Sequence, residues 1–102
     1  MTELEKQFII LGLKEGEEEF QEIDTIDDSI LNYLDSNYIY IIVDQTDKEI
    51  WIWNGKYANI RMKFIATQQA PIVRDRYGID FKIGTADEGD EPQEFKNFIG
   101  IE

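Results

Sequence analysis

The segment from Lys56 to Gly78 constrains the fold most, because no other stretch of the 102-residue chain is long enough for a helix that covers a whole sheet. At about 100° per residue it carries two apolar stripes, where an ordinary surface helix carries one. The first stripe consists of Ala58, Met62, Ile65, Ala66, Ile72, Val73 and Tyr77, and the second, on the opposite side, of Ile60, Phe64, Thr67 and Pro71. A sheet needs only the first stripe, so the second requires a separate explanation.

The rest of the chain predicts a sheet for this helix to cover. Short apolar or alternating runs separated by turn residues are typical of strands. The expected strands are Gln7–Leu13, Glu17–Ile23, Tyr38–Val43, Glu49–Trp53 and Ile79–Ile83, and short helices are expected at Asp24–Leu34 and from Pro92 onward. This order predicts an α+β fold: a central mixed sheet of about five strands, with the long helix on one face and the short helices on the other.

Two residues of the long helix predict local features. Pro71 lacks a backbone donor and clashes with the preceding turn, so we expect the helix to kink or restart there. Gly78 is placed to end it as a left-handed cap. In the C-terminal helix we expect Phe95, Phe98 and Ile99 to pack inward.

Composition excludes several classes of function. Cysteine and histidine are both absent, which removes thiolate nucleophiles, Cys/His zinc sites and the usual proton shuttle at neutral pH. The formal charge of −12 would repel nucleic acid and anionic lipid, and the Lys and Arg residues form no dense cluster in the sequence. There is no glycine-rich phosphate loop and no sign of a carboxylate buried beside a base. We therefore expect a protein that is not an enzyme.

Domain organisation and location follow from similar arguments. There is no repeat, no linker and no apolar run of the ~18 residues that a membrane span needs. The N-terminal sequence MTELEKQ lacks the basic and apolar regions of a secretory signal. We expect one domain over residues 1–102, monomeric and cytoplasmic, without membrane insertion.

Three motifs resemble the gelsolin/villin homology domain. IYIIVD (Ile39–Asp44) followed by IWIWNG (Ile50–Gly55) is similar to the family's hairpin of a buried strand ending in an acid and an aromatic strand ending in glycine. The long helix follows that glycine, as in the family. EGDEPQEFKNFIG (Glu88–Gly100) resembles the family's closing segment. The family fold, which is related to that of cofilin-type domains, agrees with the order of elements above.

The resemblance implies actin binding, because such domains insert their long helix into the hydrophobic cleft between two actin subdomains. Helix-in-groove recognition needs apolar anchors at about i, i+4, i+7 and i+11, the spacing of Ile60, Phe64, Thr67 and Pro71. Lys63, Gln68 and Arg74 flank this stripe and could supply a polar rim. Two alternatives remain: the N-terminal segment or a second copy of the chain could cover Ile60 and Phe64.

The sequence departs from the family at calcium. The family takes a carboxylate from just before the buried strand and a glutamate from the first turns of the long helix. The corresponding positions fall at Tyr38 or Ile39 and near Met62, whose side chains cannot ligate a hard cation. We expect no cofactor and a calcium site that is absent or badly weakened, unless Asp35 or Asn37 substitutes. We interpret the acids of TADEGDE (Thr85–Glu91) as a solvated turn.

A single domain also limits the expected activity. Severing and capping in the family depend on linked domains, because a second contact gains effective concentration through the linker. The sequence therefore predicts an actin-binding protein that acts on assembly by binding monomers, affecting nucleation or binding an end, without strict calcium dependence. The alternative is a scaffold or GTPase-regulating module of the same α/β sandwich type with a partner other than actin.

Overall fold

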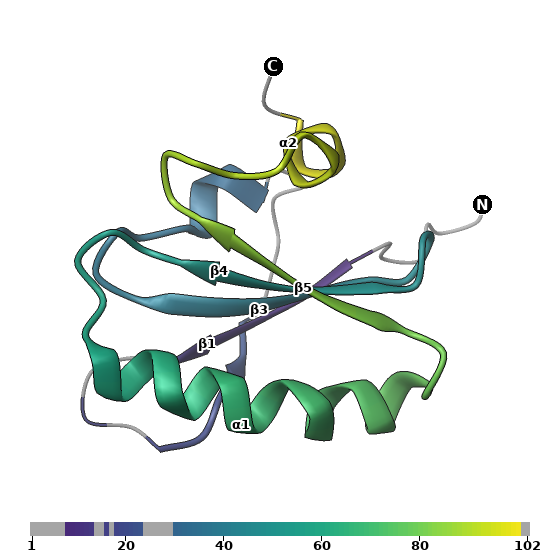
Figure 1. Cartoon of the computed structure of the whole chain (residues 1–102), viewed down its shortest axis with the longest axis horizontal. Coiled ribbons are helices and arrows are strands. Elements are labelled where there is room, and N and C mark those ends of the chain that lie inside the picture. The colour runs from purple at the N-terminus through teal and green to yellow at the C-terminus, as the bar shows by residue number, and fades with distance from the viewer. Residues whose placement is uncertain (1–7, 14–15, 17, 24–29, 101–102) are drawn as a thin grey trace.

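The computed structural model describes residues 8–13, 16, 18–23 and 30–100. Strands and helices follow one another in the order that the hydrophobic pattern predicts. They are β1 (Phe8–Leu13), β2 (Gln21–Glu22), the 3-10 helix η1 (Ile30–Tyr33), β3 (Ile39–Asp44), β4 (Glu49–Asn54), α1 (Ile60–Tyr77), β5 (Lys82–Asp87) and α2 (Gln93–Ile99). Figure 1 shows their arrangement, with α1 running along one side of the sheet.

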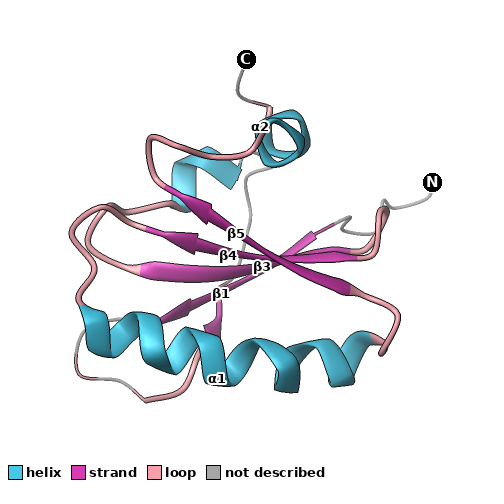
Figure 2. Ribbon diagram, viewed as in Figure 1, coloured by secondary structure: helices cyan, strands magenta, loops and turns pink. Residues whose placement is uncertain are grey.

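The sheet is mixed and has five strands in the order β2-β1-β3-β4-β5. Neighbours from β2 to β4 pair antiparallel, whereas β5 pairs parallel to β4. A parallel pair needs a crossover connection, and α1 supplies it. The α+β class and the five-stranded sheet are therefore confirmed. Figure 2 shows α1 on one face of the sheet and α2 with η1 on the other, as expected.

Two hydrophobic clusters, one on each face, hold these layers together. Because side chains of a strand alternate between the faces of a sheet, the uninterrupted apolar run of β3 fills both clusters, and every residue of β3 is buried. The cluster under α1 includes Leu13, Ile39, Ile41, Val43, Ile50, Ile52, Met62, Ala66, Ala70, Val73 and Phe81. The cluster under α2 includes Ile10, Ile30, Tyr40, Ile42, Trp51, Trp53, Ala86, Phe95 and Ile99, with Phe98 half-buried against it.

The predicted bounds of the last strand are wrong. After Gly78 the chain first makes a turn, closed by a 3.1 Å hydrogen bond from the Phe81 N–H to the Gly78 carbonyl. Phe81 then packs into the cluster under α1. The strand begins only at Lys82, whose N–H donates to the carbonyl of Lys48 at 3.0 Å. Thr85 to Asp87, which we expected in an acidic turn, therefore belong to β5.

Two N-terminal predictions are confirmed only in part. The second strand does pair antiparallel with β1, but it spans just Gln21 and Glu22. Of the helix expected at Asp24–Leu34, the structure has a 3-10 helix at Ile30–Tyr33. Residues 1–7, 17 and 24–29, which include the start of each of these predicted elements and of the first strand, lie outside the described residues.

Candidate functional site

Residues at the two ends of α1 set its length. At the start, the Asn59 side chain accepts a 2.8 Å hydrogen bond from the Met62 N–H, an N-cap that begins the helix at Ile60 rather than at Lys56. At the end, the Gly78 N–H donates to the Arg74 carbonyl at 2.7 Å. Gly78 does end the helix, but with φ 154° and ψ 135° instead of the left-handed conformation we expected. Glycine adopts such a positive φ without steric cost.

The helix passes through Pro71 as one element, so the predicted restart is wrong. The φ of proline is fixed near −65°, which suits a helix, and the missing N–H deprives only the Thr67 carbonyl of its helical donor. Pro71 and Thr67 both lie on the side of α1 away from the sheet. Water can therefore reach that carbonyl, which reduces the cost of the proline.

The side of α1 that faces the sheet matches most of the first apolar stripe. Ile65 and Tyr77 are half-buried there, as is Ala58 just before the helix, and all three pack against the cluster under α1. The fully buried residues of this side, here called the inner face, are Met62, Ala66, Ala70 and Val73. Ile72 was expected on this side, but 51% of it is exposed. One step of about 100° from Val73 carries Ile72 past the border of the contact. Ala70 is the buried residue that the predicted stripe omitted.

The second stripe lies on the solvent side. We call Ile60, Phe64, Thr67 and Pro71 the outer stripe. Ile60 is 82% exposed and Phe64, one turn further along the same side, is 60% exposed. Pro71 is half-buried and Thr67 is exposed. The Thr67 hydroxyl donates to the Lys63 carbonyl at 3.0 Å, so its donor is already satisfied within the helix. α1 thus presents a mainly apolar strip to solvent.

Charged and polar side chains border the outer stripe. Lys63 and Gln68 are exposed and Arg74 is half-buried. Arg74 contacts Asp75, its neighbour in sequence, with 3.4 Å between Nε and Oδ1. Arg61 lies 3.7 Å from Glu18, in an exposed pair. Within the part of the chain that the structure describes, Lys63 has no ion-pair partner. Its ammonium group is available to a partner molecule.

Further exposed apolar residues lie beyond both ends of α1. Tyr57 precedes the helix, Ile79 follows it, and both are exposed. Neither residue was assigned to a stripe: Ile79 follows the segment Lys56–Gly78, and Tyr57 lies within it but before the helix begins at Ile60.

Buried or half-buried side chains occupy the positions at which the resemblance implies calcium ligands. Ile39 and Met62 both belong to the cluster under α1, and Tyr38, the alternative to Ile39, is half-buried against it. The Asp35 carboxylate accepts hydrogen bonds from the backbone N–H and the side-chain amide of Asn37, at 2.9 and 3.1 Å. Among the described residues, no group of three or more acidic side chains is placed to share a metal ion. Calcium independence remains a prediction.

The acids and glycine of the three motifs have structural roles here. Asp44 is buried, and its Oδ1 accepts hydrogen bonds from the backbone N–H groups of Thr46 and Asp47, which shapes the β3–β4 turn. Burial raises the pKa of this carboxyl. A Cβ on Gly55 would lie 2.3 Å from the Ser36 carbonyl oxygen, so no other residue fits.

Glu88 corrects our interpretation of the acidic segment as a solvated turn. Its carboxylate accepts a 2.8 Å hydrogen bond from the Lys56 N–H and a 2.7 Å bond from the Ser36 hydroxyl. Glu91 accepts from the indole N–H of Trp53 at 3.0 Å. These contacts join the end of β5 to the segment that leads into α1. The closing motif therefore helps to position the helix.

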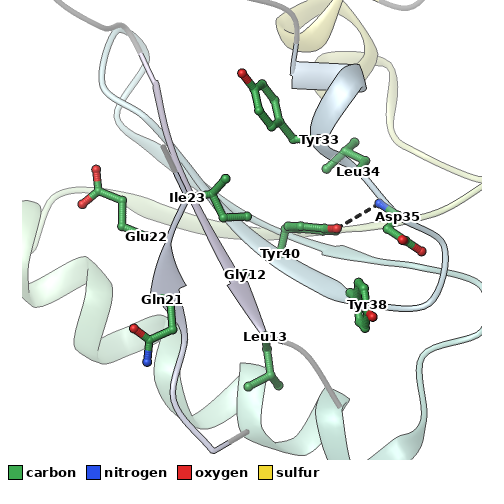
Figure 3. Close-up of a pocket in the computed structure, with 10 residues that line it drawn as sticks. All are labelled: Gly12, Leu13, Gln21, Glu22, Ile23, Tyr33, Leu34, Asp35, Tyr38 and Tyr40. Carbon is green, nitrogen blue, oxygen red and sulfur yellow. Dashed lines mark hydrogen bonds between the residues drawn. The ribbon is translucent and has the colours of Figure 1, made fainter. Parts of the chain in front are cut away.

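A cavity of about 600 Å³ lies beside β1 and β2 (Figure 3). In its lining, the Asp35 N–H donates to the Tyr40 hydroxyl oxygen at 3.0 Å. Burial raises the pKa of Tyr40 to about 12, so this phenol stays neutral at pH 7. Through this hydrogen bond Tyr40 links β3 to the segment after η1.

Comparison with solved structures identifies the fold. The chain is similar to ProGel of Thorarchaeota, from its complex with rabbit actin, with a TM-score of 0.75 and 20% identity over 91% of this chain and 99% of that one. It is also similar to Thorarchaeota 2DGel3, again from a complex with rabbit actin, with a TM-score of 0.64 and 27% identity over 95% of this chain. The chain spans about half of 2DGel3, 48% of its length.

These likenesses confirm the gelsolin-like fold that the three motifs predict. Comparison with protein-family models and with curated proteins finds no match. Among the described residues, no helix is both long and apolar enough to cross a bilayer.

Proposed function

We propose that this protein binds actin by docking the outer stripe of α1 into the hydrophobic cleft between two actin subdomains. The observation that carries the proposal is the exposed apolar stripe, with Ile60 82% and Phe64 60% exposed, on the long helix of a gelsolin-like fold. Two Thorarchaeota proteins with this fold, crystallised as complexes with rabbit actin, support the choice of partner.

The outer stripe has the chemistry of a helix that enters a groove. An amphipathic helix binds such a groove through apolar anchors on successive turns, and Ile60, Phe64, Thr67 and Pro71 occupy four such positions. Large side chains that become fully desolvated carry most of the energy of an interface. Phe64 is the largest of the four, so we propose it as the central anchor. Lys63, Gln68 and Arg74 form the polar rim.

We propose that binding changes the rate or the critical concentration of actin assembly, without strict dependence on calcium. One docking helix suits binding to a monomer or to a filament end. The positions at which the family resemblance implies ligands carry Tyr38 or Ile39 and Met62, none of which offers the carboxylate that a calcium site usually needs. Calcium should therefore change neither the affinity nor the effect on assembly.

An assembly assay with pyrene-labelled actin tests the proposal. The full chain, at tens of micromolar, is added to actin with calcium and with a calcium chelator, and the assembly rate and critical concentration are measured. We expect a change in at least one quantity, equal under the two conditions. If neither quantity changes, the actin proposal fails and a partner other than actin becomes the better explanation of the outer stripe. Titration calorimetry of the chain with calcium would contradict the second part if it gave micromolar binding.

A further inference from the structure

Charge is distributed unevenly between α1 and the rest of the molecule. α1 holds four of the ten Lys and Arg residues but only one of the 22 Asp and Glu residues, which gives it a formal charge of +3. The whole chain has a net charge of −12, so the residues outside α1 sum to a charge of −15. An acidic partner surface would be repelled by most of this protein and attracted only by α1.

The positive charges do not surround the outer stripe evenly. At about 100° per residue, Lys63 and Arg74 differ by about 20° around the helix, and they are separated by about 16 Å along its axis. Both therefore lie on one flank of the stripe, Lys63 about 70° and Arg74 about 50° from its centre. Gln68 lies about 70° round on the other flank, and Asp75, the one acidic residue of α1, lies about 50° round on that same flank.

Ion pairs within the chain increase the difference in available positive charge between the two flanks of the outer stripe. Arg61 lies on the flank that holds Gln68, further round the helix from the outer stripe. Its guanidinium is 3.7 Å from the Glu18 carboxylate. On the basic flank, Lys63 has no ion-pair partner among the described residues, and Arg74 has only its exposed contact with Asp75. An exposed pair of that kind contributes little. Arg76 is also exposed and has no ion-pair partner among the described residues, but it lies about 150° from the centre of the outer stripe. The basic flank is thus the side of the outer stripe with positive charge available to a partner.

We propose that Lys63 and Arg74 recognise an acidic wall on one side of the partner's cleft and so fix the rotational setting of α1 in it. This inference deepens the docking proposed above and rests on it. The partner would present two carboxylates about 16 Å apart along one wall, and a neutral wall opposite, next to Gln68. Charge complementarity of this kind sets orientation and specificity more than total affinity.

A charge-swap variant separates a specific wall from general electrostatic attraction. Lys63→Gln removes the charge on the basic flank, and Lys63→Gln/Gln68→Lys restores the net charge on the other flank of the same helix. Both positions are exposed, and Lys and Gln have similar helix propensities. The matched control for charge alone is Lys82→Gln, an exposed residue of β5. Affinity for monomeric actin is measured with the full chain at about 50 and about 200 mM salt, where screening differs markedly.

We expect Lys63→Gln to weaken binding about 3- to 5-fold at low salt, with a smaller difference at high salt. The swap variant should stay as weak as Lys63→Gln, and Lys82→Gln should bind like the wild type. Lys63→Gln/Arg74→Gln should lose about 10-fold. The proposal is overturned if the swap variant recovers wild-type affinity, or if Lys63→Gln binds as tightly as the wild type. Failure of the docking proposal itself would show separately, as a wild-type chain that does not bind actin.

Discussion

The two sides of α1 both carry apolar residues, but one side packs against the sheet and the other lies in solvent. The inner face contacts the sheet through Met62, Ala66, Ala70 and Val73, of which two are alanines, so the helix backbone can lie close to the strands. The outer stripe carries larger side chains, yet it leaves Ile60 and Phe64 in solvent. Packing on the sheet needs side chains that fill the space between helix and strands without voids, whereas an anchor needs exposed apolar area. Size and exposure together therefore distinguish packing from recognition on one helix.

The first prediction tests the inner face. Met62→Ala should lower the free energy of unfolding by about 2–5 kcal/mol, because a buried side chain is lost and a cavity remains. In a domain of this size each kcal/mol lowers Tm by about 4–8 °C, so thermal melting should detect the change easily. Ile60→Ala is the matched control on the outer stripe, with an expected change within about 0.5 kcal/mol. Equal losses for the two variants would remove the distinction between the sides.

The second prediction tests the outer stripe. Phe64→Asp should weaken actin binding by at least about 2 kcal/mol, roughly 30-fold, since it places a charge where a central anchor becomes desolvated. The free energy of unfolding should change by less than about 0.5 kcal/mol, because Phe64 is mostly exposed. Assembly assays and thermal melts on the same sample measure both effects. A variant that is unfolded at 25 °C would mean that Phe64 belongs to the core.

The third prediction concerns Pro71, whose effects on stability and binding should have opposite signs. Pro71→Ala restores a backbone donor in mid-helix and should stabilise the fold by about 2 kcal/mol after allowing for the more flexible unfolded chain. Loss of the ring should weaken actin binding several-fold if Pro71 is an anchor. Thermal melting and actin titration of one variant measure both effects. Unchanged affinity would shorten the outer stripe to end at Thr67, and a lower Tm would contradict our account of the helix.

The smallest effect is expected at the border between the two sides. Ile72→Ser should change the free energy of unfolding by less than about 0.5 kcal/mol, since half of that side chain is already in water. Val73→Ser, one residue further along, should cost more than about 2 kcal/mol, because it truncates a buried side chain and buries a hydroxyl. Urea unfolding of the pair locates the border to within one residue. Similar midpoints for the two variants would place it elsewhere.

Much of the fold could be predicted because its elements have strong local patterns. The apolar run of β3 and the aromatic β4 indicate a buried hairpin, and the length of the α1 segment indicates a crossover helix. The bounds of β5 could not be predicted, because they depend on a turn from Gly78 to Phe81 and on the pairing of Lys82 with Lys48. Such pairing joins residues far apart in the sequence.

The candidate site was predictable in outline and not in detail. Helical spacing placed Ile60 and Phe64 together on one side, but it assigned Ile72 to the buried side, since periodicity alone does not define how wide the contact with the sheet is. The hydrogen bond that the Lys56 N–H donates to the Glu88 carboxylate could not be predicted for a different reason. It joins residues that no motif connects, and acidic residues in a turn are usually solvated.

That bond also bears on the thermodynamics of recognition. Glu88 holds the approach to α1 at one end, and the hydrogen bond from Gly78 with the buried Phe81 holds the other end. A helix secured at both ends is already in its binding conformation, so association costs little ordering entropy beyond that of a few side chains. Calorimetry should then give a heat-capacity change that matches burial of the outer stripe alone, without the larger signature of coupled folding.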